Sequence, residues 1–196
     1  MSIHELKIYL DLSPESKSKI LDKYAKKFDF GYFFFVDSED GQCYLFDRYG
    51  NEKDISLIHE ITEDMISKDI KKIVIPNNVV SIRNWAFYRC SDLTSVTISN
   101  SVTSIGGWAF ENCINLTSVS ISNSITSIKA RAFANCNKLM NVTINSSIRN
   151  IGYRIFSHCN NLRLLIFKGK TIDQIRAMEN YPFGIEDESI IKTEFS

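Results

Sequence analysis

The sequence lacks the features that direct a chain to a membrane. No stretch approaches the roughly 18 consecutive apolar residues that a spanning helix needs. The first residues do not combine a basic segment with a following apolar run, which is the pattern of a secretory signal peptide. These two absences predict a cytoplasmic protein. Histidine is also scarce, with three residues in separate parts of the chain, so no metal-ligand spacing arises.

Closely paired cysteines are absent as well. Four of the five cysteines instead recur at a constant spacing, at Cys90, Cys113, Cys136 and Cys159. A tetrahedral zinc site usually draws on pairs such as C-x2-C, and this chain contains none. Disulfides between neighbouring members would require an oxidising compartment. We therefore predict a row of small buried thiols, with no metal and no cofactor.

An excess of charge is missing too, because 23 basic and 23 acidic residues give a net charge of zero. The distribution is nevertheless uneven. Residues 1–69 hold nine basic and 15 acidic side chains, whereas the remainder holds 14 basic and eight acidic ones. Such asymmetry bears on partners and on how the two parts dock, and it says nothing about the fold.

What the chain does contain is one pattern written repeatedly from Ile70 to about Phe167. Residues of the same kind recur every 23 positions, as in the segments 93–98, 116–121 and 139–144. We call each set of equivalent positions a column. A fixed period in this range is typical of a solenoid, in which each unit buries its apolar face only against its neighbours. We therefore expect coils of 23 residues stacked along one axis.

Each coil begins with a strand. Val96 and Ile98 flank Thr97, which is the alternation of a half-buried strand. Stacked coils pair such strands into a parallel sheet with a spacing of about 4.8 Å. An Ala-Phe step, replaced by Ile-Phe in the last coil, follows later in each coil, and its phenylalanines can stack as an internal spine. They are Phe87, Phe110, Phe133 and Phe156.

These columns resemble the repeat of the BspA-like (treponemal-type) leucine-rich repeat family. Its unit reads approximately L-x-x-V/L-x-I/L-P/S-x-x-V/I-x-x-I-x-x-x-A-F-x-x-C-x-x-L. The segments from Lys71 to Cys90 and from Leu93 to Cys113 match it closely. The resemblance covers about half of the chain. It implies a curved solenoid and a role in protein interaction, often in cell-surface adhesion, and it brings no catalytic residues.

The chain before the repeats predicts a small α+β unit. We expect a first strand at Leu6, Ile8 and Leu10, then a helix that opens at Ser13-Pro14 and ends near Phe28. Aromatic residues from 30 to 36 indicate a buried strand, and residues 43–46 form the returning strand. The alternation of residues 55–61 indicates a third strand, and residues 62–66 open a short helix.

The chain after the repeats predicts a second cap. Thr171 and Gln174 have the spacing of a capping box, which opens a helix through about Glu179. The fold class is therefore α+β, a short leucine-rich-repeat solenoid between two caps. We assign residues 1–69 to the N-terminal capping unit, 70–167 to the solenoid and 168–196 to the C-terminal helical cap, because terminal repeats need covering.

Two surfaces are candidates for binding. The first is the column before Ala-Phe, in which an arginine can lie on a tryptophan; with its neighbours it comprises Trp85, Tyr88, Arg89, Trp108, Arg131 and Arg154. These residue types are enriched in interface hot spots, but the column can equally be a self-contained ladder that stabilises adjacent coils. The second is the hydroxyl-rich outer face of the strands, whose side chains mainly help strands to stack.

Catalysis has little support in the sequence. Cys43 and His59 can be read as nucleophile and base, but the aromatic neighbours of Cys43 favour a buried, inert thiol. We therefore predict a non-enzymatic scaffold that binds another protein, with an acidic surface on the partner as one possibility.

Three alternatives remain open. The chain can be a small intracellular inhibitor of another macromolecule, of the kind that a mobile element or phage encodes. It can bind nucleic acid through the basic half of the repeats, although no recognised reader motif accompanies the charges. An adhesin, as the resemblance implies, would need a signal or anchor.

Overall fold

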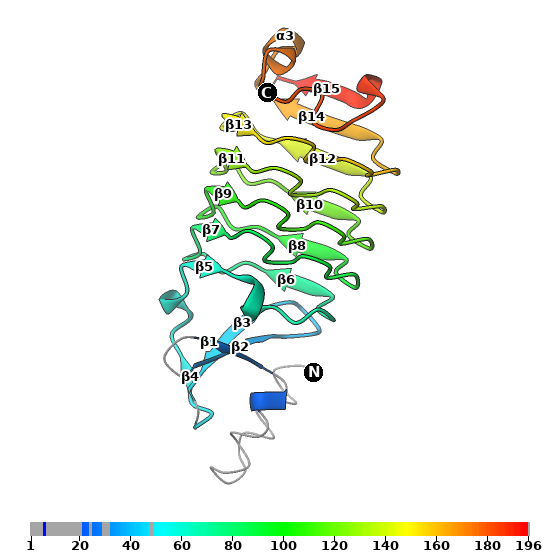
Figure 1. The fold of residues 1–196 in the computed structure, drawn as a ribbon. Coiled ribbons are helices and arrows are strands. Elements are labelled where there is room, and N and C mark those ends of the chain that lie inside the picture. The colour runs from blue at the N-terminus through cyan, green and yellow to red at the C-terminus, as the bar shows by residue number, and fades with distance from the viewer. Residues whose placement is uncertain (1–5, 7–20, 24, 29–31, 48, 196) are drawn as a thin grey trace.

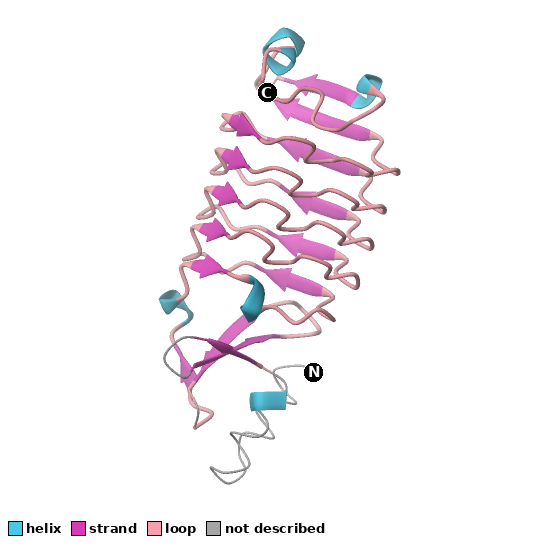
Figure 2. Ribbon diagram, viewed as in Figure 1, coloured by secondary structure: helices cyan, strands magenta, loops and turns pink. Residues whose placement is uncertain are grey.

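A computed structural model describes residues 6, 21–23, 25–28, 32–47 and 49–195. The repeats form an elongated stack of coils, with a small antiparallel sheet at the N-terminal end and a short helical segment at the other (Figure 1). Strands occupy two sides of every complete coil, and loops connect them (Figure 2). The predicted solenoid with a parallel sheet is confirmed.

The larger sheet is parallel and has six strands in the order β15-β14-β12-β10-β8-β6. Its strands are β6 (Lys72–Val74), β8 (Ser95–Thr97), β10 (Ser118–Ser120), β12 (Asn141–Ile144), β14 (Leu164–Lys168) and β15 (Ile191–Glu194). Val119 pairs with Val96 on one side and with Val142 on the other. This register equals the sequence period, so every apolar column runs straight through the stack and is buried.

A second parallel sheet of five short strands, which the sequence pattern did not predict, lies across the coil. It consists of β5 (Glu60–Ile61), β7 (Ser81–Ile82), β9 (Ser104–Ile105), β11 (Ser127–Ile128) and β13 (Asn150–Ile151). The isoleucine of each strand is buried in the core, and the residue before it lies on the outer side. Two residues are enough for each strand because the neighbouring coils hold it in place.

The third side of the coil is the loop around the Ala-Phe step, and backbone hydrogen bonds join it from coil to coil. The N–H groups of Trp85, Phe87 and Arg89 donate to carbonyls one coil further on, over 3.0, 2.7 and 2.9 Å. Two residues of this loop in each coil, four positions apart, take a positive φ although none is glycine: Trp85, Arg89, Trp108, Asn112, Arg131, Asn135, Arg154 and His158. Such a backbone is costly for side chains other than glycine, so the repeated hydrogen bonds must stabilise it.

The predicted phenylalanine spine is confirmed. The rings of Phe87 and Phe110 stack at 4.8 Å between centroids, those of Phe110 and Phe133 at 5.1 Å, and those of Phe133 and Phe156 at 5.9 Å. The four side chains are almost wholly buried. One ring in each coil therefore fixes the spacing of the core along the stack.

A four-stranded antiparallel sheet closes the N-terminal end of the stack. It contains β1 (Lys26–Phe28), β2 (Tyr32–Val36), β3 (Cys43–Phe46) and β4 (Glu52–Lys53) in that order. Phe34 and Leu45 belong to the core of the coils, whereas Phe35 and Phe46 pack in a separate cluster. The sheet therefore buries both of its faces, and the two strands predicted around residues 30–46 are confirmed.

Other expectations for this unit were wrong. The predicted helix does not continue to Phe28, because residues 26–28 form β1 and pair antiparallel with β2. Leu6 is helical rather than part of a strand, and Ile8, Leu10, Ser13 and Pro14 lie outside the described residues.

The predicted third strand is also wrong as a single element. Its first part is the 3-10 helix η2 (Ile55–Leu57), and its last two residues form β5, which pairs with β7 of the coils. The alternation of residues 55–61 runs through both pieces, so this pattern did not distinguish the 3-10 helix from the strand. The short helix expected after them is the 3-10 helix η3 (Glu63–Met65).

The C-terminal end is closed by α3 (Ile172–Arg176), the 3-10 helix η4 (Glu188–Ile190) and strand β15. The capping box between Thr171 and Gln174 is confirmed, but the helix ends at Arg176 rather than near residue 179. Phe183 is buried and packs against Phe167 at 5.7 Å between ring centroids. The cap thus adds a strand and an aromatic side chain to the last coil.

Candidate partner-binding surface

The residues before each Ala-Phe step form a row on the outside of the stack. Ala86 and Phe87 are both fully buried, so the residue ahead of them is directed away from the core. We call Trp85, Trp108, Arg131 and Arg154 the tryptophan–arginine row. All four share a φ between 53° and 59°, and the hydrogen-bonded loop holds them in equivalent positions.

The two tryptophans of the row stack on each other. Their ring centroids are 5.3 Å apart and the planes are 9° from parallel. Trp85 nevertheless leaves 44% of its surface exposed, and Trp108 is half-buried. The stack therefore presents one broad, rigid aromatic face to solvent.

The arginines of the row make different contacts from those expected. Arg131 does not lie on a tryptophan; its Nη2 and Nε lie 2.5 and 3.1 Å from the Oε1 of Glu111. The Glu111 side chain is only 7% exposed, so this pair holds a buried carboxylate. Arg154 lies over the neighbouring Tyr153 ring, 4.9 Å from its centroid. The prediction that an arginine of the row stacks on a tryptophan is thus wrong. Because Arg131 is paired with Glu111, it contributes little net charge to the surface.

Tyr88 and Arg89, the remaining predicted site residues, lie on the loop that follows Trp85. The guanidinium of Arg89 is 5.1 Å from the centroid of the Tyr88 ring. The Tyr88 carbonyl accepts a hydrogen bond of 2.6 Å from the ammonium of Lys68. Tyr88 is half-buried and Arg89 is exposed, so the two side chains can extend the aromatic face, to which Arg89 adds a positive charge.

Several hydroxyl groups at or beside the strand face join one coil to the next. Thr94 donates to the Lys71 carbonyl over 2.9 Å, and Thr117 donates to the Thr94 carbonyl over 3.1 Å. Ser99 donates likewise to the Pro76 carbonyl over 3.1 Å. Of these three residues, only Ser99 belongs to the hydroxyl-rich outer face of the strands, so the stacking role is observed there at Ser99.

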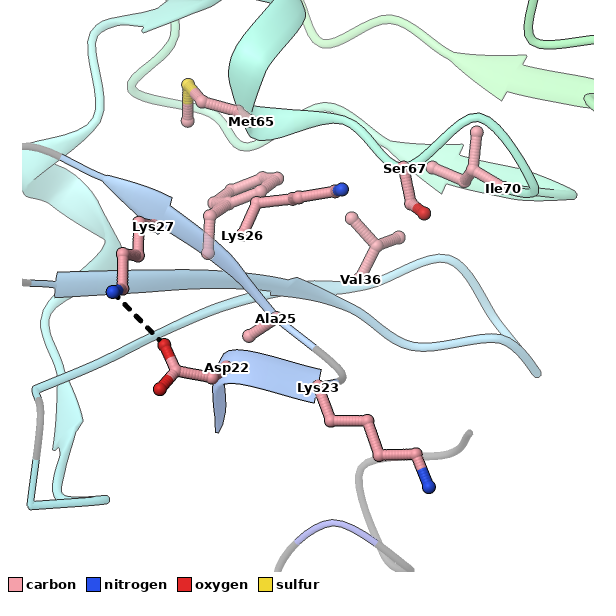
Figure 3. A pocket seen from close by; sticks show the side chains of 10 residues that line it. Asp22, Lys23, Ala25, Lys26, Lys27, Val36, Met65, Ser67 and Ile70 are labelled. Carbon is pink, nitrogen blue, oxygen red and sulfur yellow. Dashed lines mark ion pairs between the residues drawn. The ribbon is translucent and has the colours of Figure 1, made fainter. Parts of the chain in front are cut away.

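The molecule has one cavity beside Trp85 and another at its N-terminal end. One, of about 350 Å³, opens on the second sheet beside Trp85 and is lined by Ser81, Arg83, Ser104 and Lys129, among others. Another, of about 380 Å³, lies where the N-terminal sheet meets the first coil. Figure 3 shows Lys23, Lys26 and Lys27 among the side chains that line this second cavity, and an ion pair of 3.2 Å links Asp22 to Lys27. The repeat pattern of the sequence did not predict either cavity.

The cysteine row lies inside the coils, and the four thiols are unpaired. The Sγ atoms of Cys113, Cys136 and Cys159 donate to phenylalanine carbonyls of the preceding coil, over 3.1, 3.2 and 3.0 Å. Burial raises the pKa of Cys113 and of Cys136 well above the ordinary value for a thiol. Buried, neutral, hydrogen-bonded thiols serve packing rather than chemistry.

Cys43 shows no features of a nucleophile. Its Sγ lies 3.3 Å from the Val74 carbonyl, and burial, followed by the charge of Asp40, raises its pKa far above the ordinary value. Within the described part of the chain, no group of three His, Cys, Asp or Glu side chains is placed to hold a metal ion. In the same part, none of the helices has the length and apolarity to cross a bilayer.

The repeats match a known family model. Residues 65–183 match the BspA type leucine rich repeat region in six copies. The structure is similar to that of a leucine-rich repeat protein from Bacteroides ovatus, with a TM-score of 0.55 and 27% identity over 70% of this chain and 35% of that one. A search of curated proteins found no match to the sequence.

Two further structures share the fold. The T. pallidum leucine-rich repeat protein has a TM-score of 0.52 at 23% identity, over 72% of this chain and 60% of that one. The pneumococcal vaccine antigen PcpA has a TM-score of 0.54 at 16% identity, over 83% of this chain and 34% of that one. The chain therefore spans 34% to 60% of the length of these three proteins.

Proposed function

Because the chain belongs to the BspA type leucine-rich repeat family, we propose that it is a non-enzymatic module that binds another protein through the tryptophan–arginine row. Leucine-rich repeat proteins are in general interaction or adhesion modules. The observation that carries the proposal is the stacked pair Trp85 and Trp108, with Trp85 44% exposed. Aromatic and arginine side chains dominate the binding energy of protein interfaces.

Rigidity supports this assignment. An exposed aromatic pair that is already ordered loses little conformational freedom when a partner binds. The positive φ of both tryptophans is fixed by inter-coil hydrogen bonds of 3.0 Å from each backbone N–H. The partner would therefore meet a preformed face, apolar along the tryptophans and cationic at Arg89 and Arg154.

The test is a binding measurement with the full chain. Partners are captured with the wild-type protein, and the affinity of each is measured again for the double variant Trp85→Ala and Trp108→Ala. We expect a loss of about 2 kcal/mol or more, which is roughly thirtyfold in Kd. Met140→Ala is the matched control, because Met140 is a 48% exposed apolar side chain immediately before β12.

The fold should survive the double substitution, since neither side chain belongs to the core. A partner that binds the double variant as tightly as the wild type would exclude the row as the site. Should the double variant unfold while its remaining folded fraction binds normally, the stack has only a structural role.

Nucleic acid is the second candidate, because residues 70–167 carry ten basic and two acidic side chains. The pairing of Arg131 with Glu111 weakens this reading, since it neutralises one cation of the row. Binding of a labelled random duplex, with affinity that falls steeply as salt rises, would favour nucleic acid over a protein partner.

A further inference from the structure

The cavity beside Trp85 is built into the second sheet. It is lined by Ser81 of β7 and Ser104 of β9, whose small side chains lie on the outer side of adjacent strands. Trp85 also lines the cavity, which has a volume of about 350 Å³. It is therefore continuous with the aromatic face of the tryptophan–arginine row.

Gly106 lines this cavity without adding a side chain to it. A Cβ atom on Gly106 would lie 2.4 Å from the backbone nitrogen of Asn84 and 2.5 Å from the carbonyl carbon of Arg83, so no side chain fits there. The same column of the repeat holds Arg83 in the coil before and Lys129 in the coil after. Two long cationic side chains therefore flank a position that cannot carry one.

The two cations differ in their contacts. The Nε of Arg83 lies 2.9 Å from one carboxylate oxygen of Glu60, and Ser81 donates to the other oxygen over 3.1 Å. Arg83 is thus neutralised and held in place. Lys129 is exposed, and none of the ion pairs in the described part of the chain involves it. The cavity therefore has one net positive charge, at the Lys129 side.

We propose that this cavity receives the carboxylate of an acidic side chain on the partner, while an apolar neighbour of that side chain rests on Trp85. This inference rests on the proposed function and specifies the partner chemistry. Lys129 supplies the charge, and the Ser104 hydroxyl can donate a hydrogen bond. A doubly charged phosphate suits the site less well, because Glu60 already occupies the Arg83 side and would repel it.

The experiment is a selection of random linear peptides by display on the full wild-type chain. Selected peptides should be enriched in Asp or Glu next to an aromatic or aliphatic residue. Their Kd should rise about tenfold or more for Lys129→Met, which keeps the apolar stem and removes the charge, and should recover with Lys129→Arg. Lys138→Met is the matched control, because Lys138 is an exposed lysine in another column.

The outcomes separate this inference from the proposed function. If Trp85→Ala with Trp108→Ala abolishes binding and Lys129→Met does not, the row binds but the cavity does not take a carboxylate. If neither variant weakens binding, both proposals are wrong. Peptides without acidic enrichment, or a selection that yields no binder, would overturn the inference, since a preformed cavity needs no folded partner. If inorganic phosphate competes with the peptides better than acetate does, the cavity binds a phosphate group rather than a carboxylate, and the inference is wrong.

Discussion

Gly106 and Gly107 stand next to each other, and the structure predicts opposite effects for the same substitution. A Cβ on Gly106 would meet the backbone of the preceding coil at 2.4, 2.5 and 2.8 Å. A Cβ on Gly107 would find its nearest atom, the Ala130 carbonyl oxygen, at 3.4 Å, which is an ordinary contact. Neither glycine has a positive φ, so the available space alone separates them.

The magnitudes follow from this geometry. Relief of the Gly106→Ala contact needs a shift of about 1 Å, because carbon atoms pack best at about 3.5–4.0 Å. The Gly106 N–H also donates to the Ile82 carbonyl over 2.8 Å, and the shift would weaken this bond. We expect a destabilisation of about 3 kcal/mol, the upper end for overpacking. Gly107→Ala should instead stabilise the chain by about 0.4–1 kcal/mol, because alanine restricts the unfolded state.

The assay is equilibrium unfolding in urea, with Trp85 and Trp108 as fluorescent reporters within the coils and circular dichroism as the second probe. Gly152→Ala serves as a replicate, since its Cβ would lie 2.3 Å from the Ala130 nitrogen. Equal unfolding midpoints for Gly106→Ala and Gly107→Ala would refute the reasoning, because the coils would then move apart without cost.

Three further predictions concern the core and the caps. Thiol reagents should label Cys90, Cys113, Cys136 and Cys159 only after denaturation, and rapid native labelling of all four would show that the row is accessible. Burial raises the pKa of Cys90 to about 11 from 9.0. The stability that comes from burying the neutral Cys90 thiol is therefore complete below pH 9 and is lost as the pH rises towards 11. In urea titrations across this window, the free energy of unfolding should fall less for Cys90→Ala than for the wild type. A chain of residues 60–196 should aggregate or bind a hydrophobic dye, because it lacks Phe34 and Leu45 of the coil core, whereas a monomer with a sharp unfolding transition would make the first 59 residues an independent domain.

The repeat itself was readable from the sequence. Columns at a period of 23 identify which side chains share one position in successive coils, and burial of apolar columns then requires in-register stacking. The phenylalanine spine, the buried cysteine row and the strand at Val96 all follow from this single rule. The capping box at Thr171 was equally readable, because its two hydrogen bonds are local.

The N-terminal unit was less readable because its elements are short and lack repeats. Residues 26–28 continue a helical pattern of apolar positions, yet pairing with β2 decides their conformation. The residues around Ile55 and Ile61 alternate like a strand, but contacts with two different sheets divide them. Tertiary pairing overrides local preference at such places.

The sequence by itself determined the architecture and the identity of the outward row, since the period and the buried Ala-Phe step leave no other direction for Trp85 and Trp108. Only the tertiary structure decided what the row does with its neighbours. Arg131 reaches Glu111 in the preceding coil rather than a tryptophan in its own column, because a buried carboxylate needs a partner more than an exposed ring does. The cavity at Gly106 likewise depends on the distance between the backbones of two neighbouring coils, which the sequence does not specify.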